Sequence, residues 1–346
     1  MKMRYSRSVA LLAVAAASLA AAVVAGAAPA AKSVGSITLG IPGIPPVFLG
    51  VRPYVAFQKG FYAKYGVNVT IKQFTTGTDA LRAVQAGQID AAWSPTPTVL
   101  SSMAKGADLV GIEGMDVIDW LVGSIDGSVK TCADLKGQTI GIDTIGGARY
   151  AALQAMLSKC KLTISDVKTV NFPGAAAMQS MIAGQLKTSV LHIDELAQIR
   201  ASGKTVNVNV RLTDVDPYQH YDLLITTHAG VKNHYYDFVH MLAGDIAASK
   251  WMNNPKNLDE AAQIATITGD TKDISKSAIQ DYLKMNWWPY KTSGLGYSRI
   301  TRTIGLNTKL GNISPAAGLT WKKVVDPRMW RAANVLVNGK KKATGK

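Results

Sequence analysis

Two hydrophobic periodicities alternate between residues 52 and 97. Apolar side chains recur at helical spacing across 54–62, and Gly66 is typical of a residue that ends a helix. Hydrophobic and polar residues then alternate over 67–71, which is the pattern of a β-strand. This segment therefore predicts a helix followed by a strand.

The same order of elements follows at once. Thr78 is placed to cap a helix over 79–86, and the short apolar run 89–93 predicts a strand buried on both faces. Helices and strands that alternate in this way predict βαβ units and a parallel sheet. Both strands end in small, polar turn residues, and open α/β sheets bind ligands beyond the carboxyl ends of their strands. The pattern therefore predicts a ligand pocket at that edge.

The rest of the chain repeats this pattern and then becomes mainly helical. Further strands are predicted over 34–41, 108–113, 120–125, 139–142, 167–171, 188–191 and 221–227. Helices are predicted over 98–105, 149–157, 175–183, 196–201, 236–252, 275–285, 298–310 and 327–336. Four tryptophans of the helical part are expected to pack in the core, because they lie far from the strand-end loops: Trp287, Trp288, Trp321 and Trp330.

The order of these elements predicts an α/β protein with two βα lobes. One lobe occupies 34–118, a second occupies 122–216, and the chain returns over 220–338 to complete the first lobe with helices. Two crossings between the lobes form a hinge, and the strand ends of both lobes can face one ligand cleft. A short basic tail follows over 339–346.

The N-terminus has the features of a signal peptide over residues 1–31. Lys2, Arg4 and Arg7 precede an apolar run rich in alanine, and small residues from Ala27 to Ala31 offer cleavage sites. A retained membrane anchor is the alternative, but the run is short. Since no cysteine lies near the cleavage site, lipid attachment there is not expected. We therefore predict export to the periplasm.

The net positive charge of the chain does not point to a further partner. Removing the three basic residues of the signal peptide lowers the formal net charge from +15 to +12, a value that can indicate nucleic-acid binding. However, the basic residues are scattered singly, and the one basic run lies in the terminal tail. With export predicted as well, we expect no nucleic-acid partner.

The chain has two cysteines, Cys132 and Cys160. Cys132 precedes the strand predicted over 139–142, and Cys160 ends the helix that follows this strand. Since the start of a strand and the end of its following helix lie at the same edge of a βα unit, a disulfide is predicted; two buried free thiols are the alternative.

Several stretches resemble the SsuA/THI5-like family of extracytoplasmic solute-binding proteins, in the order in which that family has them. The matching stretches are 54–56 with 59–62, 66–67, 76–77 with 80–81, 86–90, 133–137, 166–167 with 170–171, 183–185, and Trp251 with 254–255. The resemblance implies a type II periplasmic-binding-protein fold that closes on a small solute such as a sulfonate, taurine or nitrate. It also implies delivery of the solute to the inner-membrane permease of an ABC importer. We expect a monomer.

The candidate ligand-binding residues lie at strand ends and near the two crossings. They are Pro45, Phe48, Thr76, Thr78, Trp93, Ser94, Pro95, Thr96, Asp116, Thr144, Gly146, Gly147, Ala148, Arg149, His192, Asp194 and Tyr218, with Pro173 and Gly174 as further members of the same loops. Backbone N–H groups at a helix N-terminus bind anions, hydroxyl groups donate hydrogen bonds, and an arginine can hold a carboxylate or sulfonate. These residue types favour a small organic anion, while the aromatic side chains leave room for a pyrimidine-type heterocycle.

Each of the more informative candidates also has a purely structural interpretation. Gly146 and Gly147 can simply allow a tight turn, and Thr78 can act as a helix cap alone. Arg149 lies in a first helical turn and can point to solvent. Trp93 can belong to the core, although its place before a polar turn favours the pocket. His192 and Asp194 can form a buried hydrogen-bonded pair instead of contacting a solute.

Motifs for catalysis are absent from the sequence. It contains no nucleophile elbow, zinc-protease motif, phosphate-binding loop or dinucleotide fingerprint, and the five histidines lack the spacing of a metal pair. We therefore expect neither an enzyme nor a cofactor. The alternatives are a ligand-sensing partner of a membrane receptor and, against the export signal, a cytosolic pyrimidine synthase of the same family.

Overall fold

The computed structural model of the protein describes residues 35–173 and 175–339. The predicted signal peptide, Gly174 and residues 340–346 of the predicted basic tail lie outside these ranges.

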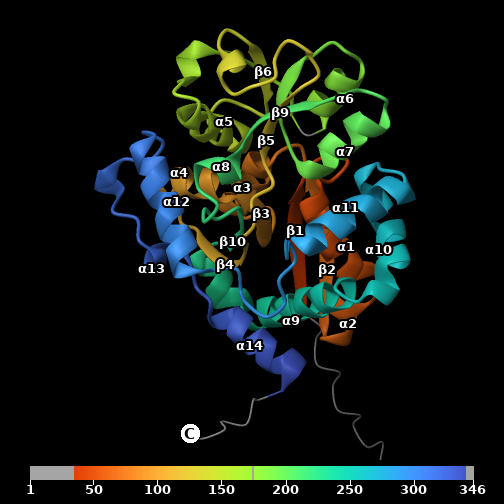
Figure 1. Cartoon of the computed structure of the whole chain (residues 1–346). Coiled ribbons are helices and arrows are strands. Elements are labelled where there is room, and N and C mark those ends of the chain that lie inside the picture. Colours follow the sequence, from red (N-terminus) through yellow and green to blue (C-terminus); the bar gives the residue numbers. More distant parts are fainter. Residues whose placement is uncertain (1–34, 174, 340–346) are drawn as a thin grey trace, which may run out of the picture. The chain divides into compact units, whose positions relative to one another are not determined.

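In the part of the chain that the structure describes, the strands form two five-stranded sheets. Figure 1 shows the two sheets with their helices. The first sheet has the order β2-β1-β3-β10-β4, and its strands are β1 (Gly35–Pro42), β2 (Val67–Phe74), β3 (Ala91–Pro95), β4 (Val110–Met115) and β10 (Asp222–Thr226). The second sheet has the order β7-β6-β8-β5-β9, and its strands are β5 (Leu121–Ser124), β6 (Thr139–Ile142), β7 (Lys168–Asn171), β8 (Thr188–Leu191) and β9 (Asn207–Arg211). We call the first sheet with its helices lobe 1, and the second with its helices lobe 2.

The helices follow the strands in both lobes and then dominate the C-terminal part. Those before the return to lobe 1 are α1 (Val51–Gln58), α2 (Phe61–Lys64), α3 (Gly77–Gln85), α4 (Thr96–Ala104), α5 (Ala148–Lys159), α6 (Ala176–Ile182), α7 (Ile193–Ala201) and α8 (Leu212–Val215). Those after it are α9 (His228–Met252), α10 (Leu258–Ala265), α11 (Lys272–Lys284), α12 (Tyr297–Lys309), α13 (Trp321–Val324) and α14 (Arg328–Asn338). The prediction of an α/β protein with two βα lobes is confirmed.

The parallel pairing that the βαβ pattern predicts is present in both sheets, where β1 pairs with β2 and β3, and β6 pairs with β7 and β8. Each sheet is nevertheless mixed, because it also contains an antiparallel strand that the pattern does not predict. Strand β10 runs antiparallel to β3 and β4, and β5 runs antiparallel to β8 and β9. Each of these two strands is the first that the chain forms after it crosses from one lobe to the other. Strands β5 and β10 therefore begin at the cleft and run away from it. The strands of the βαβ units begin at the far edge of the sheet and end at the cleft.

Two local predictions near the first lobe also differ from the structure. The helix expected over 54–62 is split into α1 and α2, because Gly60 between them has φ +68°. The N-cap of α3 is Thr76, whose hydroxyl accepts a hydrogen bond from the N–H of Asp79 at 3.1 Å, and not Thr78. The start of the helix is thus shifted toward the end of β2.

The predicted disulfide is confirmed. Cys132 and Cys160 are bonded, with their Cα atoms 5.3 Å apart and a sequence separation of 28. The bond joins the segment before β6 to the C-terminal end of α5, as the βα geometry requires. It ties together parts of lobe 2 alone.

Three of the four tryptophans expected in the core are buried there, Trp287, Trp288 and Trp330, whereas Trp321 is only partly buried. Trp287 and Trp288 are fully buried, and Trp287 packs on Tyr282 of α11 with ring centroids 4.5 Å apart. Helix α11 also packs against α7 of lobe 2. The return segment therefore contacts both lobes.

Candidate functional site

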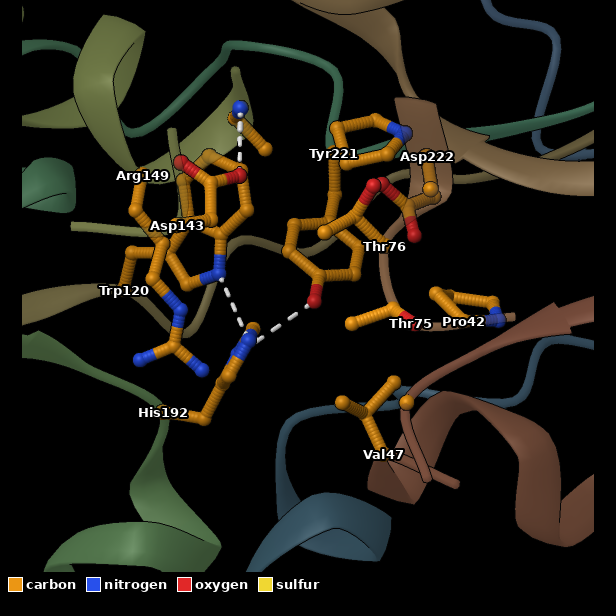
Figure 2. Close-up of a pocket in the computed structure, with 14 residues that line it drawn as sticks. Pro42, Val47, Thr75, Thr76, Trp120, Asp143, Arg149, His192, Tyr221 and Asp222 are labelled. Carbon is orange, nitrogen blue, oxygen red and sulfur yellow. Dashed lines mark hydrogen bonds between the residues drawn. The ribbon is translucent and has the colours of Figure 1, made fainter. Parts of the chain in front are cut away.

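A small cavity of about 50 Å³ lies between the two lobes. From lobe 1 it is lined by Pro42, Gly43, Val47, Thr75, Thr76, Gly77, Pro95, Tyr221 and Asp222, and from lobe 2 with its crossing segment by Trp120, Asp143, Ala148, Arg149 and His192. Figure 2 shows the labelled side chains of the two lobes facing one another. Most of these residues lie at the carboxyl ends of parallel strands, which is the position that the strand pattern predicts.

A wider hollow of about 560 Å³ continues from this cavity. The two share Thr75, Thr76 and Asp143, and the hollow also extends between α3, α4 and the loops that follow β6 and β7. We call the first the cavity and the second its mouth.

The structure brings about half of the predicted site residues to this cleft. Those that line the cavity or its mouth are Thr76, Thr78, Pro95, Thr144, Gly146, Gly147, Ala148, Arg149 and His192, together with Pro173. Those that line neither are Pro45, Phe48, Trp93, Ser94, Thr96, Asp116, Asp194 and Tyr218.

The two predicted aromatic contacts belong to the core instead. Trp93 is fully buried, and the guanidinium of Arg52 lies 5.1 Å from its ring centroid. Phe48 is also buried and stacks on Tyr282 at 5.1 Å. Trp93 points away from the cavity because its β-strand is covered on both faces, so the structural interpretation holds for it.

The other outlying candidates have partners of their own. Ser94 donates to the carbonyl of Gly77 at 3.1 Å, and Thr96 contacts His220 at 2.7 Å. Asp116 lies 3.9 Å from Arg299, and the exposed Tyr218 packs under Arg299 and Arg302. Pro45 lies on the surface beside Gly269.

Arg149 faces inward and not toward solvent. Its two terminal nitrogens lie 3.0 and 2.7 Å from the two carboxylate oxygens of Glu195, and Nη1 also donates to the carbonyl of Val190 at 2.6 Å. Burial lowers the pKa of Arg149, but Glu195 outweighs this effect and raises it above the ordinary value. The guanidinium is therefore a permanent charge with an internal counterion.

The N-terminus of α5 is likewise occupied from within. The carboxylate of Asp143 accepts hydrogen bonds from the N–H groups of Thr144 at 2.8 Å and Ala148 at 2.9 Å. A Cβ atom on Gly147 would lie 2.7 Å from this carboxylate, so glycine is required there for the carboxylate to approach. The helix terminus that the sequence marks as an anion site thus holds an anion of the protein.

His192 joins the cavity wall to the buried interior. Its Nδ1 lies 3.0 Å from Asp119, and the indole N–H of Trp120 donates to its Nε2 at 3.1 Å, with the Tyr221 hydroxyl also near the ring (Figure 2). Burial lowers the pKa of His192, and the carboxylate of Asp119 raises it. The hydrogen bond from Trp120 decides between these opposing effects, because a second ring proton on Nε2 would face the indole N–H; the ring is therefore neutral, with its proton on Nδ1.

Behind His192, one tyrosine hydroxyl lies between two carboxyl groups. Tyr282 Oη is 2.8 Å from Asp119 and 2.7 Å from Asp194. One hydroxyl hydrogen cannot serve both, so both contacts are hydrogen bonds only when one carboxyl group carries a proton. Burial raises the pKa of Asp194 to about 6, so Asp194 is the partner that carries this proton below that pH. His192 and Asp194 are both buried, but each is bonded to a third residue and not to the other.

Several cavity residues were missed by the sequence analysis. Asp143 directly follows β6, so the strand-end rule could have found it. Tyr221 and Asp222 lie at the start of β10, which reaches the cavity by its N-terminal end because it is antiparallel. Trp120 precedes β5, the other antiparallel strand, and no signal in the sequence places it there.

Within residues 35–173 and 175–339, no group of three or more histidine, cysteine, aspartate or glutamate side chains has the arrangement of a metal site. None of the helices described is long and apolar enough to cross a membrane.

Two mixed sheets with a cavity between their strand ends define a type II periplasmic-binding-protein fold. The family model described as "NMT1/THI5 like" matches residues 48–256, which is more than half of the chain. The protein therefore belongs to the NMT1/THI5-like family, in agreement with the resemblance seen in the sequence.

Individual relatives are distant. A candidate binding protein of Brucella abortus is 24% identical over 132 residues, and the match spans 38% of this chain and 40% of the relative. The periplasmic nitrate-binding protein NrtA of Synechocystis PCC 6803 has a TM-score of 0.74 at 15% identity, with 88% of this chain and 89% of NrtA covered. A protein of Bordetella bronchiseptica RB50 has a TM-score of 0.72 at 23% identity, covering 87% and 97%. At these identities the structural similarity shows the fold.

Proposed function

We propose that the protein is the periplasmic solute-binding component of an ABC importer. It captures a small organic solute between its lobes and delivers it to an inner-membrane permease. The observation that carries this proposal is the cavity, which is built from strand-end residues of both sheets and is therefore completed only when the lobes approach.

Relatives of the same fold support this proposal. NrtA of Synechocystis is a nitrate-binding protein, SsuA of Escherichia coli (TM-score 0.61, 18% identity) binds aliphatic sulphonates, and a Staphylococcus aureus relative (TM-score 0.70, 14% identity) is the ligand-binding component of an ABC-type import system. The signal-peptide pattern of residues 1–31 supports export. We propose a monomer without a catalytic role, since capture and release require neither a second copy nor a reacting group.

The experiment that tests the proposal measures lobe closure on solute binding. Gln88 and Gln185 are exposed and occupy corresponding turns, one in each lobe, and the native disulfide leaves no other free thiol in the described chain. Spin labels on a Gln88→Cys/Gln185→Cys variant, refolded to remove carried-over solute, should move closer when a solute from a thermal-unfolding screen is added. A bound solute at about 100 times its dissociation constant stabilises by about 2.7 kcal/mol, which such a screen detects.

The matched control carries both labels on lobe 1. In a Gln88→Cys/Lys256→Cys variant, the distance between the labels should not change when the solute is added. Binding without a change in the inter-lobe distance would contradict the closure mechanism, and the absence of any binding solute would contradict the solute-binding role itself.

A further inference from the structure

The positive groups at the cavity already have partners within the protein. Arg149 is paired with both oxygens of Glu195, at 3.0 and 2.7 Å. The N-terminus of α5 is capped by Asp143, which accepts from the N–H of Ala148 at 2.9 Å. Two of the three features that favoured an anionic solute in the sequence are therefore used internally, and an anion would have to displace a carboxylate of the protein to reach either.

A carboxyl group at the cavity, in contrast, lacks a partner. Asp222 lines the cavity and is only 2% exposed, and within the described chain its buried Oδ1 has no hydrogen-bond partner. Its backbone pairs with Pro95 and Met115, so it is held in the middle of the lobe 1 sheet. A buried polar group without a partner costs about 1–3 kcal/mol, which a ligand that supplies the missing hydrogen bond would recover.

The rest of the wall suits the same kind of ligand. Asp143 lines the cavity from lobe 2, and the aromatic side chains of Trp120 and Tyr221 lie beside it, with ring centroids 5.3 Å apart. Aromatic faces attract cations, most strongly where water is excluded. Carboxyl groups on two sides and aromatic rings between them form an environment for positive charge.

We propose that the cavity binds a small organic cation, whose ammonium or amidinium group pairs with Asp222 and lies within the field of Asp143. This inference rests on the proposed function, because it names the class of solute that the same cleft captures. Binding is coupled to a proton: Asp222 binds the cation as a carboxylate, and the proton that its carboxyl group carries in the empty cavity passes to solvent.

The charged groups around Asp222 determine the sign of this coupling. Burial raises the pKa of Asp222 well above its ordinary value, and the negative charge of Asp119 raises it further, whereas His192 lowers it only when its ring is protonated. Tyr221 is adjacent, Arg149 is neutralised by Glu195, and His220 two residues away is held by Thr96 and the carbonyl of Gly294. Because a cation favours the ionised form, its affinity should rise with pH up to the pKa of Asp222 in the empty protein; an anion would show the opposite trend.

The test uses pairs of probes with the same carbon skeleton and opposite charge. Ethylamine is compared with ethanesulfonate, and benzylamine with phenylmethanesulfonate, on the refolded protein by thermal unfolding and titration calorimetry between pH 5.5 and 7.5. We expect an amine to bind, its affinity to rise with pH, and calorimetry in buffers of different ionisation enthalpy to show proton release. This calorimetric measurement needs no variant.

Asp222→Asn keeps the shape of the side chain and removes its charge. The variant should lose about 10- to 100-fold in affinity for the amine and should abolish proton release. Asp281→Asn, on the exposed side of α11, is the matched control and should bind as the parent does. If a sulfonate binds and the amines do not, or if Asp222→Asn binds the amine unchanged, the inference is wrong while the solute-binding role stands. If no probe or other solute binds, both are wrong.

Discussion

Two buried arginines occupy corresponding positions in the two lobes. Arg52 is the second residue of α1, which follows β1, and Arg149 is the second residue of α5, which follows β6. Strands β1 and β6 each stand second in their sheets. Each arginine makes two contacts with one glutamate: Arg52 with Glu113 at 3.2 and 2.5 Å, and Arg149 with Glu195 at 3.0 and 2.7 Å.

The surroundings of the two pairs differ. Arg52 is fully buried beneath the ring of Trp93, and its Nε has no partner within the described chain. Arg149 borders the cavity between the lobes. The same position in a βα unit thus produces the same ion pair in both lobes. The residues that surround the pair determine whether it belongs to the core or to a binding site. The comparison suggests four measurements.

The largest expected effect follows from breaking the pair in lobe 1. Arg52→Met leaves the buried carboxylate of Glu113 without its counterion, so the free energy of unfolding should fall by about 3–5 kcal/mol. Urea denaturation measures this loss. Arg52→Met/Glu113→Gln removes both charges and should recover much of it. A loss below about 1 kcal/mol for the single variant would show that Glu113 is solvated or protonated.

The disulfide allows a second comparison of the two lobes, because it lies in lobe 2 alone. Cys132→Ser/Cys160→Ser opens a loop of 28 residues, and the unfolding free energy should fall by about 3–4 kcal/mol. Hydrogen exchange should become faster in β6 and β7 and remain unchanged in β1 and β2. Equal acceleration in both sheets would indicate that the lobes unfold as one unit.

The third effect depends on pH and concerns the contact between α11 and lobe 2. Burial raises the pKa of Asp194 to about 6, so the folded protein holds this proton more tightly than the unfolded chain does. The contribution of Asp194 to stability is therefore present at low pH and is lost as the pH rises from about 4 to about 6.

Asp194→Asn tests this sign. The amide can donate to Tyr282 as the protonated carboxyl does and cannot ionise. Relative to the parent protein, the variant should gain about 2–3 kcal/mol in unfolding free energy between pH 4 and pH 7. If the unfolding free energies of the two proteins change with pH in the same way, the proton shared with Tyr282 is not carried by Asp194.

The smallest expected effect concerns Arg149, the arginine of lobe 2. Arg149→Met should cost about 1.5 kcal/mol, less than Arg52→Met, because Arg149 lines the cavity and its truncation opens Glu195 to water there. Urea denaturation in the same buffer gives the direct comparison. Equal losses for the two variants would mean that the cavity wall makes no difference to the pair.

Much of the local structure can be predicted from the sequence. The strands over 139–142 and 188–191 begin and end where the hydrophobic pattern places them, and the position of two cysteines on one βα unit predicts their bond. Asp143 was missed, but it too lies at the carboxyl end of a parallel strand, where the pattern predicts cavity residues. Periodicity and turn chemistry are properties of neighbouring residues, so they can be read from the chain alone.

The character of the cavity depends on contacts between distant residues. Arg149 and Glu195 are separated by 46 residues, and Asp119 and Tyr282 by 163. The direction of β10 places Asp222 at the cavity, and packing on both faces of β3 removes Trp93 from it. The two βα lobes and the edge at which they can bind a solute follow from the hydrophobic pattern alone. Which charges remain free there was decided by the tertiary structure, since a buried charge takes the nearest partner in space.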